Sequence, residues 1–289
     1  MLAVSIDGQL ISDLTQATIP VNDHGLLYGD GVFEGLRFYN GKVFRWQAHF
    51  ERLLDSARAI GLRLPATEAA LKADVEQCIS AAGLADGYVR LLVTRGSGPL
   101  GVNPAQCRQP RTVVIVDHLA MVSEASRQRG IKAIIAGSRR LEPDQLDPRI
   151  KSLNYLNQVL ARMEANAAGA EEAILLNRAG RVAEGTADNV FIVKQGQLLT
   201  PPVTEGALNG ITRNVIIEVA RQLSVPCTEQ PLTVYDLYTA DECFLTGTGA
   251  ELIPVAELSQ RQVGDGTPGP VFQQLQRGFE ALVKAETSA

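Results

Sequence analysis

The chain has 289 residues, of which 45% are hydrophobic and 20% are charged, and its formal net charge is −5. This composition is ordinary for a folded globular protein and excludes a disordered chain. The mild acidity argues against nucleic-acid binding and against an anionic membrane surface. The apolar runs are too short to span a bilayer, and the first residues lack the pattern of a secretory signal, so we expect a cytoplasmic protein.

Two hairpin turns are predicted near the N-terminus, at Asp7-Gly8 and Asn40-Gly41. Further along, the pattern predicts helices over 46–61 and 67–82, strands over 88–94 and 112–116, a strand over 131–137, a helix over 152–168, four short strands between 175 and 200, a helix over 211–223, a strand over 242–246 and a closing helix over 269–285. Strands and helices are segregated, which predicts an α+β fold with antiparallel or mixed sheets.

Residues 119–130 are polar and only weakly periodic. This segment is predicted to be an interdomain linker. It would join a small N-terminal α/β domain, residues 1–118, to a larger C-terminal domain, residues 131–289.

The cysteines and histidines are scattered along the chain and form none of the short spacings that bind zinc. We therefore expect reduced thiols and no metal site. A Gly-x-Ser-x-Gly motif is also missing, which leaves a serine hydrolase without support.

Lys151 differs from the other five lysines of the chain. It stands between Ile150 and Leu153 at an expected junction of loop and helix, whereas Lys42 and Lys194 are next to turn residues. A neutral amine among apolar groups can attack a carbonyl carbon. The alternative is a lysine whose ammonium simply reaches solvent.

Three glycine-containing segments could offer backbone N–H groups to a phosphate, and they are Gly206–Arg213, Gly247–Glu251 and Gly29–Gly31. The first precedes and opens a predicted helix, and a helix N-terminus binds anions. Ordinary turns would explain each segment equally well. Glu184 and Arg52 are candidates only in combination with these segments, since each alone could be a surface residue.

Six segments together resemble the class IV pyridoxal-phosphate aminotransferases. These segments are YGDGVFEG at 28–35, HFERLLDSA at 49–57, RIKSLNYLNQVLA at 149–161, EGTADNVFIV at 184–193, GITR at 210–213 and FLTGTGAELIPV at 244–255. The family contains branched-chain aminotransferases, which the chain resembles most, D-amino-acid aminotransferases and aminodeoxychorismate lyases. The resemblance implies the fold-type IV, D-amino-acid aminotransferase-like architecture, with two α/β-type domains, the cofactor between them and a homodimer.

The resemblance also implies a role for each matching residue of the cofactor site. Lys151, in the C-terminal domain, would bind pyridoxal 5′-phosphate covalently and shuttle a proton, while Glu184 would keep the pyridine nitrogen protonated. Arg52 would pair with the phosphate. The remaining cofactor contacts would be Tyr155 near the ring oxygen, Leu208 against the ring, and Ile211, Thr212 and Thr248 at the phosphate.

The implied substrates are leucine, isoleucine and valine, with 2-oxoglutarate as the acceptor. An aromatic wall would suit the branched side chains, and Arg90 would receive the distal carboxylate of glutamate. The wall would consist of Tyr28, Phe33, Tyr88 and Tyr155. The other substrate contacts would be Arg37, Gly247, Gly249 and Ala250, with Gly101-Val102 contributed by the partner subunit.

Other functions also fit the sequence. ADN at 187–189 and LNGITR at 208–213 stand where the commonest branched-chain versions have GEN and LPGITR. D-amino-acid transamination is therefore an alternative, and so is the lyase, although its GDGxFET reads GDGVFEG here. A non-catalytic protein that binds an anionic small molecule would have no need of Lys151 together with Glu184.

Overall fold

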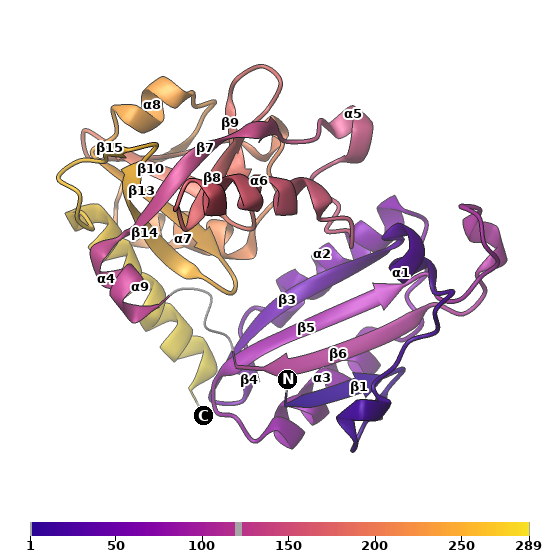
Figure 1. Cartoon of the computed structure of the whole chain (residues 1–289). Coiled ribbons are helices and arrows are strands. Elements are labelled where there is room, and N and C mark those ends of the chain that lie inside the picture. The colour runs from indigo at the N-terminus through magenta and orange to yellow at the C-terminus, as the bar shows by residue number, and fades with distance from the viewer. Residues whose placement is uncertain (1, 119–122, 289) are drawn as a thin grey trace. The chain divides into compact units, whose positions relative to one another are not determined.

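The computed structural model describes residues 2–118 and 123–288 and divides the chain into two units (Figure 1). The first unit comprises Met1–Leu119, Ile150–Asn154 and Val283–Ala289. The second comprises Ala120–Arg149 and Tyr155–Leu282. Each unit has its own sheet, and the architecture is the expected α+β fold.

The first unit contains a six-stranded antiparallel sheet in the order β2-β1-β6-β5-β3-β4. Its strands are β1 (Ala3–Ile6), β2 (Gln9–Leu10), β3 (Gly31–Tyr39), β4 (Lys42–Val43), β5 (Gly87–Thr94) and β6 (Arg111–Asp117). Asp7-Gly8 joins β1 to β2 and Asn40-Gly41 joins β3 to β4, and all four residues have positive φ. Both predicted hairpins are confirmed, because Asn-Gly and Asp-Gly pairs adopt this backbone at low cost.

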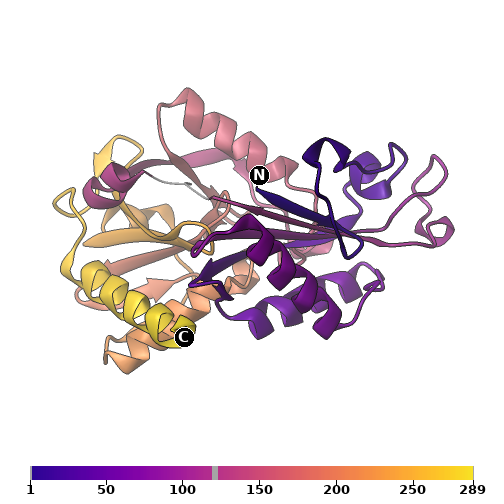
Figure 2. The ribbon, with the colours of Figure 1, turned by 90° about the horizontal axis from the view of Figure 1, so that it is seen from below.

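Two helices, α2 (Trp46–Ala59) and α3 (Glu68–Ala82), cover one face of this sheet (Figure 2). Val32, Leu36 and Phe38 are fully buried in the core that these helices share with β3 and its neighbours. Thr67 caps α3 by accepting a hydrogen bond from the backbone N–H of Ala70. A short helix, α1 (His24–Tyr28), precedes β3.

The second unit contains a mixed sheet in the order β12-β11-β10-β13-β14-β7-β8-β9, with β15 paired to β14. Its strands are β7 (Ile131–Arg139), β8 (Glu172–Leu176), β9 (Val182–Gly185), β10 (Asn189–Lys194), β11 (Gln197–Thr200), β12 (Cys227–Glu229), β13 (Glu242–Gly247), β14 (Glu251–Leu258) and β15 (Arg261–Gln262). The pairs β11–β12, β14–β7 and β7–β8 are parallel.

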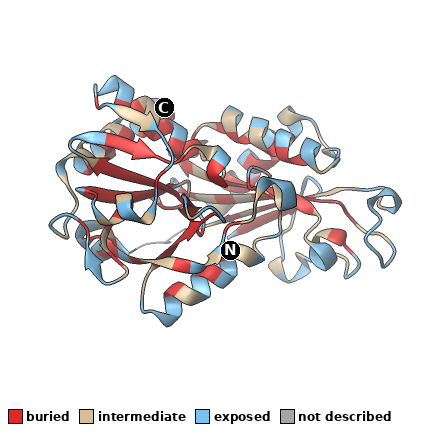
Figure 3. Cartoon of the chain, turned by 90° about the horizontal axis from the view of Figure 1, so that it is seen from above, coloured by how far each residue is buried: buried red, intermediate tan, exposed pale blue. Residues whose placement is uncertain are grey.

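The helices of the second unit are α4 (Glu124–Arg129), α5 (Pro143–Leu146), α6 (Leu156–Ala167), α7 (Ile211–Gln222), α8 (Val234–Tyr238) and α9 (Pro270–Thr287), the last residues of α9 belonging to the first unit. Through Ala161 and Ala165, α6 packs on β7 and β8. The strands of the sheet are largely buried (Figure 3). Within residues 2–118 and 123–288, no helix combines the length and the apolar character that crossing a membrane requires.

The segment around Lys151 differs from its prediction. A helix was expected from residue 152 in the C-terminal domain, but α6 begins at Leu156, and residues 150–154 group with the first unit. The reason is pairing with β3: Leu153 N–H donates to Gly31 O (2.9 Å), and Ser152 forms a β-bridge with Val32. These contacts hold the backbone in an extended conformation, so the helix begins only at Leu156.

The predicted linker over 119–130 also differs in part. Residues 119–122 lie outside the described residues. Glu124–Arg129 form α4, which begins where the Ser123 hydroxyl accepts a hydrogen bond from Ser126 N–H (3.1 Å). A side-chain cap of this kind stabilises even a short polar helix.

Candidate active site

The backbone of Lys151 is held beside the beginning of β3 by two hydrogen bonds, one with Phe33 and one with Ser56. Phe33 N–H donates to Lys151 O (3.0 Å), and Lys151 N–H donates to the Ser56 hydroxyl of α2 (3.1 Å). The lysine is half-buried, and its Nζ lies 4.6 Å from the centre of the Phe33 ring. The first unit therefore presents an amine from a fixed backbone against an aromatic ring.

Four of the residues predicted to line the substrate pocket, Phe33, Arg37, Tyr88 and Arg90, share one face of the first sheet. Residues directly opposite each other on β3 and β5 are Gly35 with Arg90 and Arg37 with Tyr88, and such pairs point to the same side. The Arg90 guanidinium carbon lies 4.5 Å from the Phe33 ring centre and 5.5 Å from that of Tyr88. A Cβ at Gly35 would collide with the Tyr88 hydroxyl, so a larger residue there would displace the Tyr88 side chain.

Tyr28, the last residue of α1, lies next to the Gly101 loop of its own chain. Its hydroxyl accepts a hydrogen bond from Gly101 N–H (2.7 Å). The neighbouring Val102 is 80% exposed. Tyr28 therefore contacts the Gly101-Val102 loop within its own chain. The contribution of this loop to a partner subunit stays a prediction.

Arg52, on α2, makes a two-point ion pair with the buried carboxylate of Glu34. Arg52 Nε donates to Oε1 (2.8 Å) and Nη2 donates to Oε2 (2.7 Å). His49 Nδ1 lies 2.7 Å from Glu34 Oε2. The predicted phosphate-binding arginine therefore belongs to a buried cluster of three side chains.

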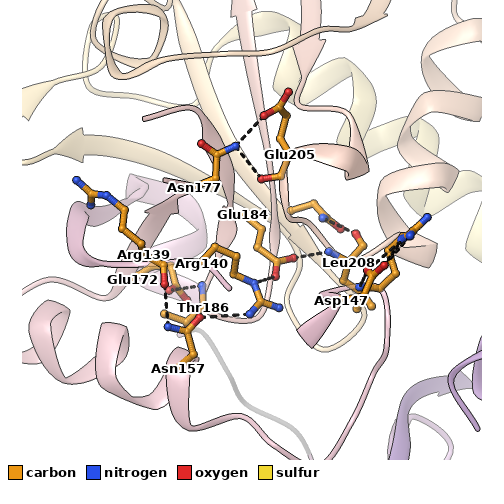
Figure 4. Close-up of polar contacts among 12 residues, drawn as sticks. Arg139, Arg140, Asp147, Asn157, Glu172, Asn177, Glu184, Thr186, Glu205 and Leu208 are labelled. Carbon is orange, nitrogen blue, oxygen red and sulfur yellow. Dashed lines mark hydrogen bonds and ion pairs between the residues drawn. The ribbon is translucent and has the colours of Figure 1, made fainter. Parts of the chain in front are cut away.

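In the second unit, both carboxylate oxygens of Glu184 are held by protein groups (Figure 4). Arg140 Nε donates to Oε1 (2.7 Å), and Leu208 N–H donates to Oε2 (2.8 Å). Arg140 is 6% exposed and Glu184 is 5% exposed. Arg140 also donates to Asn157 Oδ1 of α6 (3.3 Å). Charged hydrogen bonds of this kind fix the direction of the Glu184 carboxylate.

The beginning of α7 offers backbone N–H groups to an anion. Gly210 is the N-cap and provides no side-chain cap, and Ile211 and Thr212 in the first turn are buried. Asn189 Nδ2 donates to Leu208 O (2.9 Å) and secures the preceding turn. A Cβ at Gly210 would collide with Asn189 Oδ1, so a larger residue would displace the Asn189 side chain that secures the turn.

The other two glycine segments that were predicted to bind a phosphate lie in different local structures. Thr248–Ala250 form the turn between β13 and β14, and a Cβ at Gly247, the last residue of β13, would collide with Asp188 Oδ1. Thr248 is half-buried in this turn. In the third segment, Gly29 ends α1 with positive φ, and Asp30 forms an ion pair with Arg95. The third segment therefore has a structural explanation.

Tyr155 is half-buried at the N-cap of α6. Glu34, His49 and Arg140 were not expected to be parts of the candidate site. Glu34 could have been found, because a carboxylate alternating with Val32 and Leu36 lies on the apolar face of a strand. Arg140 gave no local signal, since its contact with Glu184 joins residues 44 positions apart.

The comparisons with known proteins identify the family of the chain. Residues 31–258 match the family model described as Amino-transferase class IV. The chain belongs to the class IV aminotransferases. It is 44% identical to the putative branched-chain-amino-acid aminotransferase of Methanocaldococcus jannaschii, over 97% of this chain and 96% of that one.

Two other similarities bear on the substrate. A D-alanine aminotransferase of Bacillus licheniformis is 35% identical over 99% of each chain. The solved structure of the branched-chain amino acid aminotransferase of Escherichia coli superposes with a TM-score of 0.94. That structure is 34% identical and aligns with 99% of this chain, covering 96% of its own.

Each unit of this aminotransferase, taken by itself, has groups whose chemistry suits part of pyridoxal phosphate, and the family implies this cofactor. The first unit supplies an amine, Lys151, and a guanidinium, Arg52. The second supplies a buried carboxylate, Glu184, and the amide and hydroxyl donors at the start of α7. In the described parts of the chain, no group of histidine, cysteine and acidic side chains is arranged to hold a metal ion.

Proposed function

We propose that this aminotransferase transfers the amino group of L-leucine, L-isoleucine or L-valine to 2-oxoglutarate, giving branched 2-oxo acids and L-glutamate. The observation that carries the proposal is the single sheet face in the first unit on which Phe33 and Tyr88 flank Arg90. Aromatic rings suit an apolar side chain, and a guanidinium suits a second carboxylate. The 44% identity to a putative branched-chain aminotransferase supports the same substrate class.

The cofactor in this proposal is pyridoxal 5′-phosphate. When bound, the cofactor supplies a protonated ring that withdraws electrons from the substrate Cα. Lys151 Nζ accepts the proton that leaves Cα, and Glu184 keeps the ring nitrogen protonated. The other assigned cofactor contacts are Arg52, Tyr155, Leu208, Ile211, Thr212 and Thr248.

The substrate residues are proposed on the same basis. Phe33 and Tyr88 contact the branched side chain, and Arg90 binds the distal carboxylate when glutamate or 2-oxoglutarate takes its place. One pocket can then serve both half-reactions, since Arg90 already lies over the Phe33 ring (4.5 Å). The remaining assigned substrate contacts are Tyr28, Arg37, Gly247, Gly249 and Ala250.

D-amino-acid transamination is the second candidate. It is favoured by the 35% identity to a D-alanine aminotransferase over nearly the whole of both chains. The two candidates differ in the stereochemistry of the amino donor. They do not differ in the cofactor residues.

A panel of amino donors tests the proposed function. The purified enzyme, loaded with cofactor, is incubated with 2-oxoglutarate and either L-leucine, L-valine, D-alanine or aminodeoxychorismate, and the glutamate formed is measured and its enantiomer determined. We expect L-glutamate from the two branched-chain donors. Activity confined to D-alanine would replace the proposal with the second candidate, and release of pyruvate from aminodeoxychorismate would indicate the lyase.

We also propose that the enzyme is a homodimer or a higher homo-oligomer. The outer side of α6 exposes four apolar side chains at helical spacing, Leu156, Val159, Leu160 and Met163, each between 47% and 63% exposed. An apolar stripe of this kind is typical of a surface covered by another chain. Light scattering on the full-length enzyme should give at least twice the mass of the chain, and a monomer would contradict the proposal.

Glu184→Gln should retain the cofactor but lower the turnover about tenfold to a hundredfold. A neutral amide stabilises a protonated ring nitrogen less than a carboxylate does, by about 1.5–3 kcal/mol for a charged hydrogen bond. Glu205→Gln is the matched control, because Glu205 is also a buried carboxylate that accepts from an arginine Nε, that of Arg181 (2.6 Å). Unchanged turnover in Glu184→Gln with cofactor bound would exclude the proposed role.

A further inference from the structure

Glu34 occupies an unusual place for a charged side chain. It alternates along β3 with Val32 and Leu36, which are fully buried, and only 1% of its surface is exposed. Burying a carboxylate costs several kcal/mol unless close partners compensate for the lost hydration. A strand that needed only a packed core would have an apolar residue here.

The partners of Glu34 are Arg52 and His49, both on α2. Burial opposes ionisation of the carboxyl, but the charge and hydrogen bonds of Arg52, together with the hydrogen bond of His49, outweigh it and lower the pKa of Glu34 to about 2. Burial also lowers the pKa of His49. Because a carboxylate can only accept, His49 Nδ1 donates to Oε2, and the negative charge of Glu34 lies directly against the positive charge of Arg52.

The contacts of Glu34 fix the orientation of the Arg52 guanidinium. Because Nε and Nη2 both bind the carboxylate, the plane of the guanidinium cannot rotate without breaking a charged hydrogen bond. The Nη1 side of the group then faces away from Glu34. His49 holds Oε2 from another direction, so the carboxylate itself is kept in place.

We propose that Glu34, supported by His49, is a positioning residue that orients Arg52 toward the phosphate of the cofactor. This inference rests on the proposed function, which assigns Arg52 to the phosphate. Glu34 does not touch the cofactor in this proposal and acts only through Arg52. A guanidinium oriented in advance loses less side-chain freedom when it binds a phosphate, which favours the phosphorylated ligand.

The ion pair between Asp30 and Arg95 provides a comparison within the same unit. It has the same two-point geometry, with Arg95 Nε and Nη2 each 2.9 Å from a carboxylate oxygen. Arg95 also donates to the carbonyl oxygens of Ile60 and Gly61 at the end of α2. These contacts give the Asp30 pair a structural role, so it is a matched control.

The test compares pyridoxal phosphate with pyridoxal, which lacks only the phosphate. The full-length enzyme is freed of cofactor, and the dissociation constant of each ligand is measured by equilibrium dialysis. The ratio of the two constants isolates the contribution of the phosphate. We expect Glu34→Gln to reduce the preference for the phosphorylated ligand about tenfold to a hundredfold, as expected when a charged hydrogen bond is lost. Asp30→Asn should leave the ratio unchanged.

Each other outcome has a defined meaning. An unchanged ratio in Glu34→Gln would overturn the inference and leave the proposed function intact. A wild-type enzyme that binds neither ligand, or does not prefer the phosphorylated one, would overturn the assignment of Arg52 and the inference with it. If Glu34→Gln does not fold, Glu34→Asp replaces it: its shorter side chain cannot keep all three contacts, so an unchanged ratio there also overturns the inference.

Discussion

Borohydride treatment of the cofactor-loaded enzyme should attach pyridoxyl phosphate covalently to the peptide that contains Lys151. Lys151 Nζ lies 4.6 Å from the Phe33 ring on a backbone held by Phe33 and Ser56. Lys151→Ala should abolish the labelling and lower the turnover by at least about 10²- to 10⁴-fold, the usual contribution of a proton-transferring group. Mass spectrometry of the labelled peptides and steady-state rates are the measurements.

Lys194 is the matched control for this experiment. It is the last residue of β10 and is also half-buried, and its Nζ lies 5.2 Å from the centre of the Tyr235 ring. Its Nζ donates a hydrogen bond to the Thr239 hydroxyl (2.7 Å). Lys194→Arg should retain both the label on Lys151 and the turnover. A label on Lys132 or on Lys194, or no label at all, would contradict the transamination proposal.

Arg90→Met should damage the glutamate half-reaction far more than the leucine half-reaction. The methionine keeps apolar contact with Phe33 and Tyr88 but removes the charge that the proposal pairs with the distal carboxylate. The loss of transition-state binding for glutamate should be about 2–4 kcal/mol, as expected when a charged partner is removed. Leucine has no second carboxylate and should lose much less.

Stopped-flow measurement of each half-reaction, in wild type and variant, gives the two ratios directly. Arg111→Met is a suitable control, because Arg111 lies on β6 of the same sheet and pairs with Asp7 (3.5 Å). It should change neither half-reaction. Equal losses for leucine and glutamate in Arg90→Met would indicate that Arg90 binds the α-carboxylate or supports the fold.

Local sequence signals predicted most elements because their causes are local. Asn-Gly and Asp-Gly turns adopt positive φ wherever they occur, so the hairpins at Asp7-Gly8 and Asn40-Gly41 could be predicted without knowledge of the fold. The two ends of α3, at Thr67 and Gly83, could be predicted for a similar reason, since caps act within one helical turn. Strand β14 was not predicted, and Pro254 within it is untypical of a central strand.

The family could likewise be inferred from the sequence alone. Six motifs in a fixed order resembled the class IV aminotransferases, and the match over residues 31–258 confirms the membership. The motifs contain Lys151, Arg52 and Glu184, which the proposal places at the cofactor. The motifs did not determine the substrate preference, because a relative named as a branched-chain aminotransferase and another named as a D-alanine aminotransferase both match most of the chain.

The way the candidate residues are held depends on contacts between distant parts of the chain. Pairing with β3 moved the start of α6 to Leu156 and grouped Lys151 with the first unit. The Glu34–Arg52 and Arg140–Glu184 contacts join residues 18 and 44 positions apart. Turn and cap preferences act over a few residues, whereas a buried charge needs an opposite charge that the folded chain brings beside it. Local patterns were therefore enough to predict most of the elements and the family, and the folded chain set which charges meet.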